Sequence, residues 1–260
     1  MKSIFYFSSN KNKFCFFSNI MILSFLFVFF GSTTTNIVLA STEPQISVEN
    51  VNSLALKSDG TVWAWGRNKS GQLGDGTNRS KNIPVQVSTL SDIIAIAVGR
   101  NHSLALKSDG TVFAWGNNIV GQLGDGSNKS SNEPVEVTGL SNVISIAAGV
   151  GKSFALKSDG TLWAWGFNGN GQLGDGTNTN RSEPVQVTGL NDIIDIAIGR
   201  YHSLALKSDG TIWAWGKNGS GQLGDGTNTN SNVPVQVKNL NLNVTPTPTV
   251  TVTPTPIPTP

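Results

Sequence analysis

The chain of 260 residues carries 18 Lys and Arg against 16 Asp and Glu, a formal net charge of +2, and a single cysteine, Cys15. Three of the lysines and the cysteine lie within residues 1–40, so the remaining chain has 15 basic against 16 acidic residues and a formal charge of −1. This balance argues against nucleic-acid and anionic-membrane binding. The missing cysteines exclude disulfides, a thiol nucleophile and a cysteine metal site in that part.

Residues 1–40 have the pattern of an export signal. Lysines precede an apolar run at residues 20–30, and small residues lead up to Ala40. The run is short for a membrane span, so cleavage after Ala40 is favoured over the alternative of an uncleaved anchor. We therefore expect a protein that is secreted, either free outside the cell or associated with the cell surface. Contact with the membrane is expected only during export.

The next feature along the chain is an internal repeat. The tetrapeptide Ser-Asp-Gly-Thr begins at Ser58, Ser108, Ser158 and Ser208, a period of 50 residues, and most of the surrounding sequence recurs with it. A fixed period of this length indicates a repeat architecture, because one such unit cannot bury its apolar faces alone. The chain is therefore predicted to fold as a stack of four similar units.

Each unit contains four stretches with the character of strands. The first two are joined by Ser108-Asp109-Gly110 in the second unit, and Asp-Gly between alternating apolar runs predicts a hairpin. The glycine-rich segment 121–128 is predicted to be an ordered loop. The strands expected in the second unit are 103–107, 111–115, 134–137 and 143–148.

These strands are apolar on both faces. Strict alternation at residues 93–98 would place Ile94, Ile96 and Val98 on one face and two alanines on the other. Strands of this kind need cover on both sides, which a flat two-sheet sandwich does not give. The predicted fold class is therefore all-β, a β-propeller-type array of four 50-residue blades over residues 41–243.

Residues 99–118, followed by Gly121-Gln122-Leu123-Gly124, resemble the repeat of the regulator of chromosome condensation family, and the match recurs four times across residues 51–237. The resemblance implies a propeller whose best-known member has seven blades and promotes nucleotide exchange on a small nuclear GTPase. Secreted bacterial relatives, including a β-lactamase inhibitor of similar architecture, serve instead as binding surfaces, and the export pattern favours this bacterial secreted type. The fold alone does not decide between these functions.

Four units alone do not decide whether the blades close into a ring. The strand at 46–48 begins the array and the strand at 234–237 ends it, and the two are complementary parts of one blade. The last strand could therefore pair beside the first hairpin and close a ring. An open or partial propeller, a ring of several chains and a truncated reading frame are the alternatives. An open array would expose apolar blade faces and promote self-association.

The loop before each hairpin, at 49–52, 99–102, 149–152 and 199–202, differs between units that otherwise repeat almost unchanged. Variable loops on a constant scaffold commonly carry binding, and the resemblance implies that these loops share a face used for partner contact. For the two histidines, hydrogen bonds to neighbouring blades are the favoured alternative. The candidate binding residues are Arg100, Asn101, His102, Lys152, Arg200, Tyr201 and His202.

The repeated Gly-Asp-Gly-Thr-Asn loop is a weak candidate for a calcium site, because the positions after its aspartate lack the carboxylates of such a site. The aspartates of this loop are predicted to cap turns, namely Asp75, Asp125, Asp175 and Asp225. The tryptophans are predicted to pack in the core rather than to bind sugar.

The chain has two histidines, no phosphate loop and no distinctive pair of acids. We therefore expect no catalytic residue, metal or cofactor.

Together these features predict a non-catalytic, secreted protein-interaction module with a protein or cell-surface partner. A carbohydrate- or cell-wall-binding surface protein is the alternative. Exchange on a GTPase comes third. The family's exchange factor presents acidic and histidine groups from such loops, whereas the three matching loops here contain arginine, lysine and histidine but no aspartate. Residues 244–260 alternate Thr and Pro and are predicted to be an extended linker.

The export signal predicts that the mature protein begins at Ser41, because Ala40 is the small residue that closes the pattern. Mass spectrometry of the exported protein measures this directly. A protein retained in the membrane with residues 1–40 still attached would replace secretion by membrane anchoring.

Overall fold

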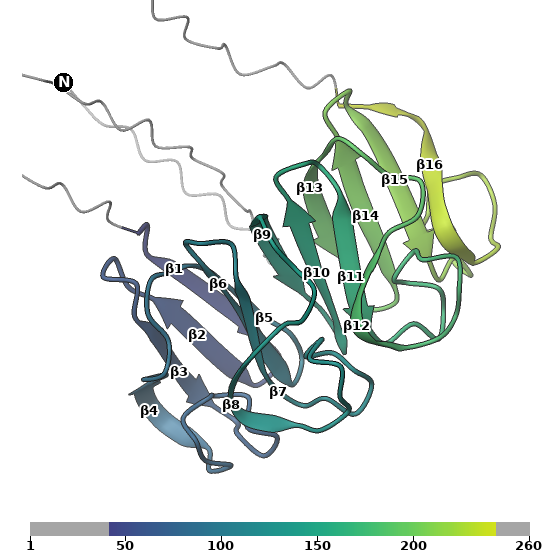
Figure 1. Cartoon of the computed structure of the whole chain (residues 1–260). Helices are drawn as coiled ribbons and strands as arrows, with labels where there is room; N and C mark the ends of the chain where they lie inside the picture. The colour runs from purple at the N-terminus through teal and green to yellow at the C-terminus, as the bar shows by residue number, and fades with distance from the viewer. Residues whose placement is uncertain (1–41, 243–260) are drawn as a thin grey trace, which may run out of the picture. The chain divides into compact units, whose positions relative to one another are not determined.

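The computed structural model describes residues 42–242. The predicted export signal and the Thr-Pro linker lie outside the described residues. Within residues 42–242 the regular structure consists of sixteen strands in four antiparallel sheets of four strands each (Figure 1). No helix in this part of the chain is long and apolar enough to cross a membrane. The predicted all-β array of four blades is confirmed.

Every blade is built from four strands that follow one another in the sequence, so each sheet is complete within one stretch of chain. The first sheet contains β1 (Gln45–Glu49), β2 (Asn52–Leu56), β3 (Val62–Gly66) and β4 (Lys81–Gln86). The second sheet contains β5 (Ile93–Val98), β6 (His102–Lys107), β7 (Val112–Gly116) and β8 (Ser131–Glu136).

The third and fourth sheets repeat this order. The third contains β9 (Val143–Ala148), β10 (Lys152–Lys157), β11 (Leu162–Gly166) and β12 (Arg181–Gln186). The fourth contains β13 (Ile193–Ile198), β14 (His202–Lys207), β15 (Thr211–Gly216) and β16 (Ser231–Asn241). Because β16 pairs with β15 and β1 pairs with β2, the ring closure considered from the sequence is not formed.

The hairpin between β6 and β7 forms as the Asp-Gly pair predicts. The Lys107 amide donates to the Thr111 carbonyl at 2.9 Å, and Gly110 takes a φ of 86° that a side chain would oppose. The Asp109 carboxylate accepts from the Thr111 amide at 3.0 Å. The local chemistry of the turn therefore fixes the pairing of the two central strands, and the same pairing recurs in the other three blades.

The alternation predicted for β5 is wrong at its start. Ile93 is fully buried and Ile94 is 38% exposed, although Ile96 and Val98 are buried on one face as expected. The pairing of β5 with β6 shifts between Ile93 and Ala95, so one additional residue is inserted there. Such a bulge reverses the side on which the preceding side chains lie.

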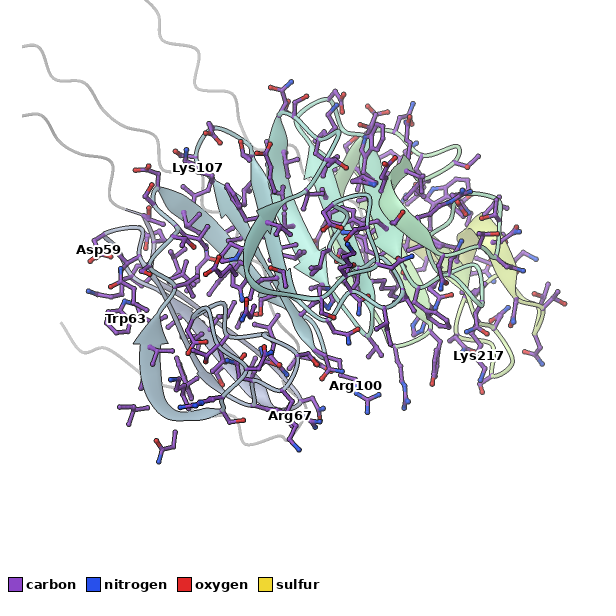
Figure 2. All side chains as sticks on the ribbon, turned by 60° about the horizontal axis from the view of Figure 1, so that its bottom comes forward. Asp59, Trp63, Arg67, Arg100, Lys107 and Lys217 are labelled. Atoms are coloured by element: carbon purple, nitrogen blue, oxygen red, sulfur yellow. The ribbon has the colours of Figure 1, made fainter. Side chains whose placement is uncertain are left out.

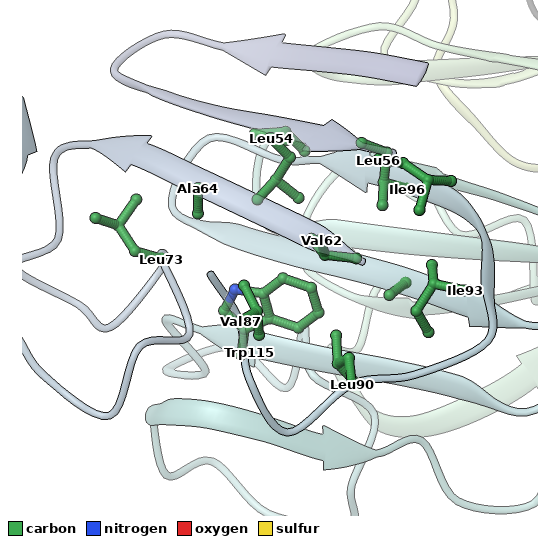
Figure 3. Packing of buried hydrophobic residues seen from close by; sticks show 12 residues of the cluster. Leu54, Leu56, Val62, Ala64, Leu73, Val87, Leu90, Ile93, Ile96 and Trp115 are labelled. Carbon is green, nitrogen blue, oxygen red and sulfur yellow. The ribbon is translucent and has the colours of Figure 1, made fainter. Parts of the chain in front are cut away.

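The core lies between the blades. One cluster joins Leu54, Leu56 and Val62 of the first sheet to Ile96 and Trp115 of the second (Figure 3). Equivalent clusters join the second sheet to the third and the third to the fourth. Within residues 42–242, no sheet pairing or core cluster joins the first sheet to the last. The array of four blades is therefore open.

In the second, third and fourth blades, the tryptophan that ends the Trp-Ala-Trp or Phe-Ala-Trp motif spans the boundary to the preceding blade. Trp165 is fully buried, its Nε1 donates to the backbone carbonyl of Gln122 at 3.0 Å, and its ring covers Gly124 of the preceding blade. Trp115 and Trp215 make the same contact with Gln72 and Gln172. The predicted core role is confirmed for these three tryptophans. The other four are half-buried, namely Trp63, Trp65, Trp163 and Trp213.

Replacing Trp165 with alanine is expected to lower the free energy of unfolding by about 3–5 kcal/mol, because the change empties a closed site between blades and removes a buried hydrogen bond. Trp65 occupies the same repeat position in the first blade but is only partly buried. The matched control Trp65→Ala should therefore cost much less. Denaturant unfolding of both variants checks this, and equal losses would contradict the interblade role.

Candidate functional site

The variable loops lie at one end of the sheets, beside a second variable segment. In the second blade the backbone N–H of Asn117 donates to the backbone carbonyl of Asn101 at 2.8 Å. In the fourth blade the backbone N–H of Lys217 donates to the backbone carbonyl of Tyr201 at 2.8 Å. We call this the variable-loop end. It consists of residues 49–51, 99–101, 149–151 and 199–201 together with 67–70, 117–120, 167–170 and 217–220.

The second segment was missed by the sequence analysis. Its first position follows the repeated Trp-Gly and holds Arg67, Asn117, Phe167 or Lys217 in the four units. The signal that could have found it is the same as for the first loop, namely variation inside a nearly constant repeat. The structure joins the two variable segments in each blade by a backbone hydrogen bond of 2.8 Å.

Aromatic and basic side chains meet at this end of the fourth blade. The Arg200 guanidinium lies 4.9 Å from the centre of the Tyr201 ring, and the Lys217 ammonium lies 5.3 Å from it. Both distances are within the range of cation–π attraction. Arg200 and Lys217 remain exposed and Tyr201 is half-buried. The three side chains therefore form a surface that combines positive charge with an aromatic ring.

The positive charge of the variable-loop end is not balanced. Figure 2 shows Arg67, Arg100 and Lys217 along one edge, away from Asp59 and Lys107. The exposed basic residues of this end have no carboxylate partner within residues 42–242, and its one acidic residue is Glu49. The basic residues of this end are Arg67, Lys69, Arg100, Arg200 and Lys217.

The opposite, hairpin end is neutralised locally. Lys57 lies 3.0 Å from the Asp59 carboxylate, and Lys107 lies 3.1 Å from that of Asp109. The nearly even balance of basic and acidic residues gave no sign of a basic surface. The basic residues are dispersed along the chain, but the fold brings the unpaired ones together at the variable-loop end.

Two of the candidate binding residues are buried. His102 is fully buried and its Nε2 lies 2.9 Å from Ser153 Oγ in the next blade. Lys152 is also fully buried and its Nζ donates to the His202 carbonyl of the next blade at 3.0 Å. Both side chains therefore link neighbouring blades, and this placement favours the structural alternative for His102. Arg100 and Arg200 are exposed, whereas Asn101, Tyr201 and His202 are half-buried.

Burial changes the titration of these side chains. Loss of solvation lowers the pKa of His102 to about 4 and that of Lys152 to about 7. The pKa of His202 is lowered by its partial burial and then by the charge of Lys152. Near neutral pH both histidines are held in their neutral forms, so neither adds to the positive charge of the variable-loop end.

The aspartates of the glycine-rich loops cap turns, as predicted. Asp75 Oδ1 accepts from the Thr77 amide at 3.0 Å and from the Asn68 Nδ2 at 3.0 Å. Asn68 is fully buried, and its Oδ1 accepts from the Leu73 amide at 2.9 Å. The same contacts recur in the other three blades. The carboxylates therefore hold the loop in shape, through a buried asparagine that the sequence analysis had not singled out.

The sequence profile of the RCC1-like domain matches residues 33–251 of the chain. Protein RCC2 of Homo sapiens and its homologue in Danio rerio are each 40% identical over 52 residues, which cover 19% of this chain and 10% of either relative. The chain therefore spans only a small part of the curated relatives it matches.

Two solved structures are similar over most of the chain. Prp20p from Saccharomyces cerevisiae, whose binding to Gsp1p and histones is described with its structure, has a TM-score of 0.68 and 28% identity. Human WBSCR16 has a TM-score of 0.67 and 26% identity. The match covers 75% of this chain in both cases, and 50% and 53% of the two relatives. The chain thus spans about half the length of these relatives.

Lys152 makes stability dependent on pH. Its pKa is about 7 in the folded chain against an ordinary value of 10.5, so between these values the unfolded state holds more protons and stability rises with pH. The variant Lys152→Met should flatten this rise, whereas Lys217→Met, at an exposed lysine, should not. Chemical unfolding at a series of pH values measures the slopes. Equal slopes in the wild type and Lys152→Met would contradict the buried amine.

Proposed function

Since the chain belongs to the RCC1-like domain family, we propose that it is a non-catalytic protein-interaction module that is exported and binds its partner through the variable-loop end. The observation that carries the proposal is the position of the variable residues. They vary on a scaffold whose remaining residues are nearly constant, and two separate segments of each repeat meet at the same end of the blade. Loops of this kind are where binding residues are commonly found.

The composition of this end fits an acidic protein surface. Arginine and tyrosine are enriched among the residues that dominate binding energy, and Arg100, Arg200 and Tyr201 are available to a partner. Unpaired basic side chains speed the encounter with a partner of opposite charge and disfavour basic partners. We infer a partner with a cluster of carboxylates at the contact.

Comparison with relatives supports a protein partner. Prp20p is described with its binding to Gsp1p and histones, and the same protein, also called yeast RCC1, has been solved with Kap60 bound to it. Nucleotide exchange on a GTPase has less support in this chain, because the loops at 99–102, 149–152 and 199–202 contain no aspartate. The export pattern of residues 1–40 also separates the chain from a cytosolic GTPase.

A carbohydrate surface would need exposed aromatic rings. Trp115, Trp165 and Trp215 are fully buried between blades, so they offer no platform for a sugar. The aromatic side chains of the variable-loop end are Phe167 and Tyr201, both half-buried. Tyr201 lies beside the basic groups of Arg200 and Lys217. Capture from secreted protein and capture on cell-wall polysaccharide, compared side by side, separate the two partner classes, and a nucleotide-release assay tests exchange.

The triple variant Arg100→Ala/Arg200→Ala/Tyr201→Ala should weaken binding to the captured protein while leaving the thermal unfolding midpoint nearly unchanged, because exposed loop side chains contribute little to the core. Calorimetric titration measures the affinity. Wild-type affinity should fall as salt is raised, since the contact is between exposed charges.

The matched control is Lys57→Ala/Lys107→Ala, which removes two basic side chains at the hairpin end. It should leave the affinity unchanged. If the triple variant binds as tightly as the wild type, the binding face lies elsewhere, with the Gly-Gln-Leu-Gly-Asp-Gly loops as the next candidate.

A further inference from the structure

The first blade exposes a face that is core in every other blade. Ile46 is 83% exposed, whereas its repeat equivalents Ile96, Ile146 and Ile196 are 2%, 1% and 8% exposed. Val48 is 61% exposed, and Val98, its equivalent in the second blade, is 5% exposed. The side chains are the same or closely similar, so the difference arises because no blade within residues 42–242 packs on this face of the first sheet.

Polar groups on this face also lack the partners that their equivalents have. In the second blade, Trp115 Nε1 and Ser103 Oγ both donate to the carbonyl of Gln72, at 3.0 and 2.9 Å. Their equivalents in the first blade, Trp65 and Ser53, are half-buried and make no such bond within residues 42–242. The first blade therefore carries two unused donors at fixed positions.

The last blade carries the matching acceptor. The carbonyl of Gln222 is equivalent to those of Gln72, Gln122 and Gln172, and it receives no donor within the described part of the chain. Gly224 is exposed, whereas Gly74 and its other equivalents are buried beneath a tryptophan of the following blade.

The apolar part of the last face corresponds in the same way. Phe154 of the third blade lies with its ring centre 6.3 Å from that of Trp215 in the fourth. Its equivalent in the last blade is Leu204, which is half-buried. Leu240 of β16 is 49% exposed, whereas its equivalents Leu90 and Leu190 are buried and Leu140 is half-buried. The last face thus has the apolar side chains of the interior boundaries, but no further blade packs on them within residues 42–242.

We propose that a second copy of this chain covers these faces head to tail, with the first blade of one copy packed on the last blade of another. Trp65 Nε1 and Ser53 Oγ of one copy donate to the Gln222 carbonyl of the next, and the Trp65 ring covers Gly224. Three boundaries inside the chain have this geometry, so each copy presents both halves of a contact that the sequence already forms. Figure 1 shows the two halves on different sheets, the first (β1–β4) and the last (β13–β16).

Because the two faces differ, the contact is heterologous, and each copy keeps one free face after pairing unless the assembly closes into a ring. The use of two different faces distinguishes the proposed contact from non-specific association of apolar surfaces. A chain blocked on its first face can still offer its last face, and the reverse holds for a chain blocked on its last face. Two such variants should therefore pair once with each other and go no further.

The experiment follows the mass of the purified protein by analytical ultracentrifugation across a concentration series. The wild type should associate, and Ile46→Glu and Leu204→Glu should each weaken association at least about tenfold, because either change puts a charge into an apolar contact. An equimolar mixture of the two variants should form a dimer with one copy of each. The double variant should stay monomeric alone and in mixtures.

Two further variants keep the result decisive. Leu240→Glu replaces Leu204→Glu on the last face if the latter lowers the unfolding midpoint, since Leu240 is more exposed. Ile119→Glu is the matched control, because Ile119 is 72% exposed but lies at the variable-loop end. It should associate like the wild type. A wild type that is monomeric up to roughly 1 mM, a mixture that does not pair, or an equal effect of Ile119→Glu would each overturn the proposal.

Discussion

The hydrogen bond from a tryptophan indole to a backbone carbonyl of the preceding blade is the contact on which the rest of the array depends. Trp165 reaches the Gln122 carbonyl only because residue 124, two positions further along that loop, is glycine, where a Cβ would lie 2.7 Å from the indole nitrogen. Gly124 also has a φ of 71°, which other residues resist. Loop and tryptophan therefore constrain each other, and this explains why the Gly-Gln-Leu-Gly and Trp-Ala-Trp segments change so little between units.

At the variable-loop end, by contrast, the packing between blades places little constraint on residue identity. The side chains of Arg100 and Arg200 are exposed, so their identity has little effect on how the blades stack. The base of this loop is held by side chains, since His102 and Lys152 both bond to the next blade, and the Arg100 backbone amide also donates to the Gly149 carbonyl of the next blade. The burial of an amine there disfavours the charged form, so this position affects stability, and the exposed positions beside it remain free for recognition.

The parts of the fold that the sequence predicts are those decided locally. The Asp109-Gly110 turn and the capping aspartates depend on neighbours a few residues away, so residue type alone identifies them. The bulge at Ile93 was not predictable from alternation, because it is a property of pairing with β6. The basic character of the variable-loop end was missed for a similar reason. Arg67, Arg100 and Lys217 are far apart along the chain and gather only when the blades stack.

Because the repeats are nearly uniform, the outer faces of the first and last blades have the residues of interior faces. Stacked repeats usually finish with units whose outer face is polar, because the last unit has no neighbour to cover it. Here Ile46 and Leu204 keep the apolar character of interior positions, and Trp65 and Gln222 keep the polar groups of an interior boundary. The first and last blades thus have the same contact-forming residues as the middle ones. A boundary stabilised by one indole, one glycine and one carbonyl does not depend on chain continuity across it, so the interaction that orders four blades within one chain is also available between chains.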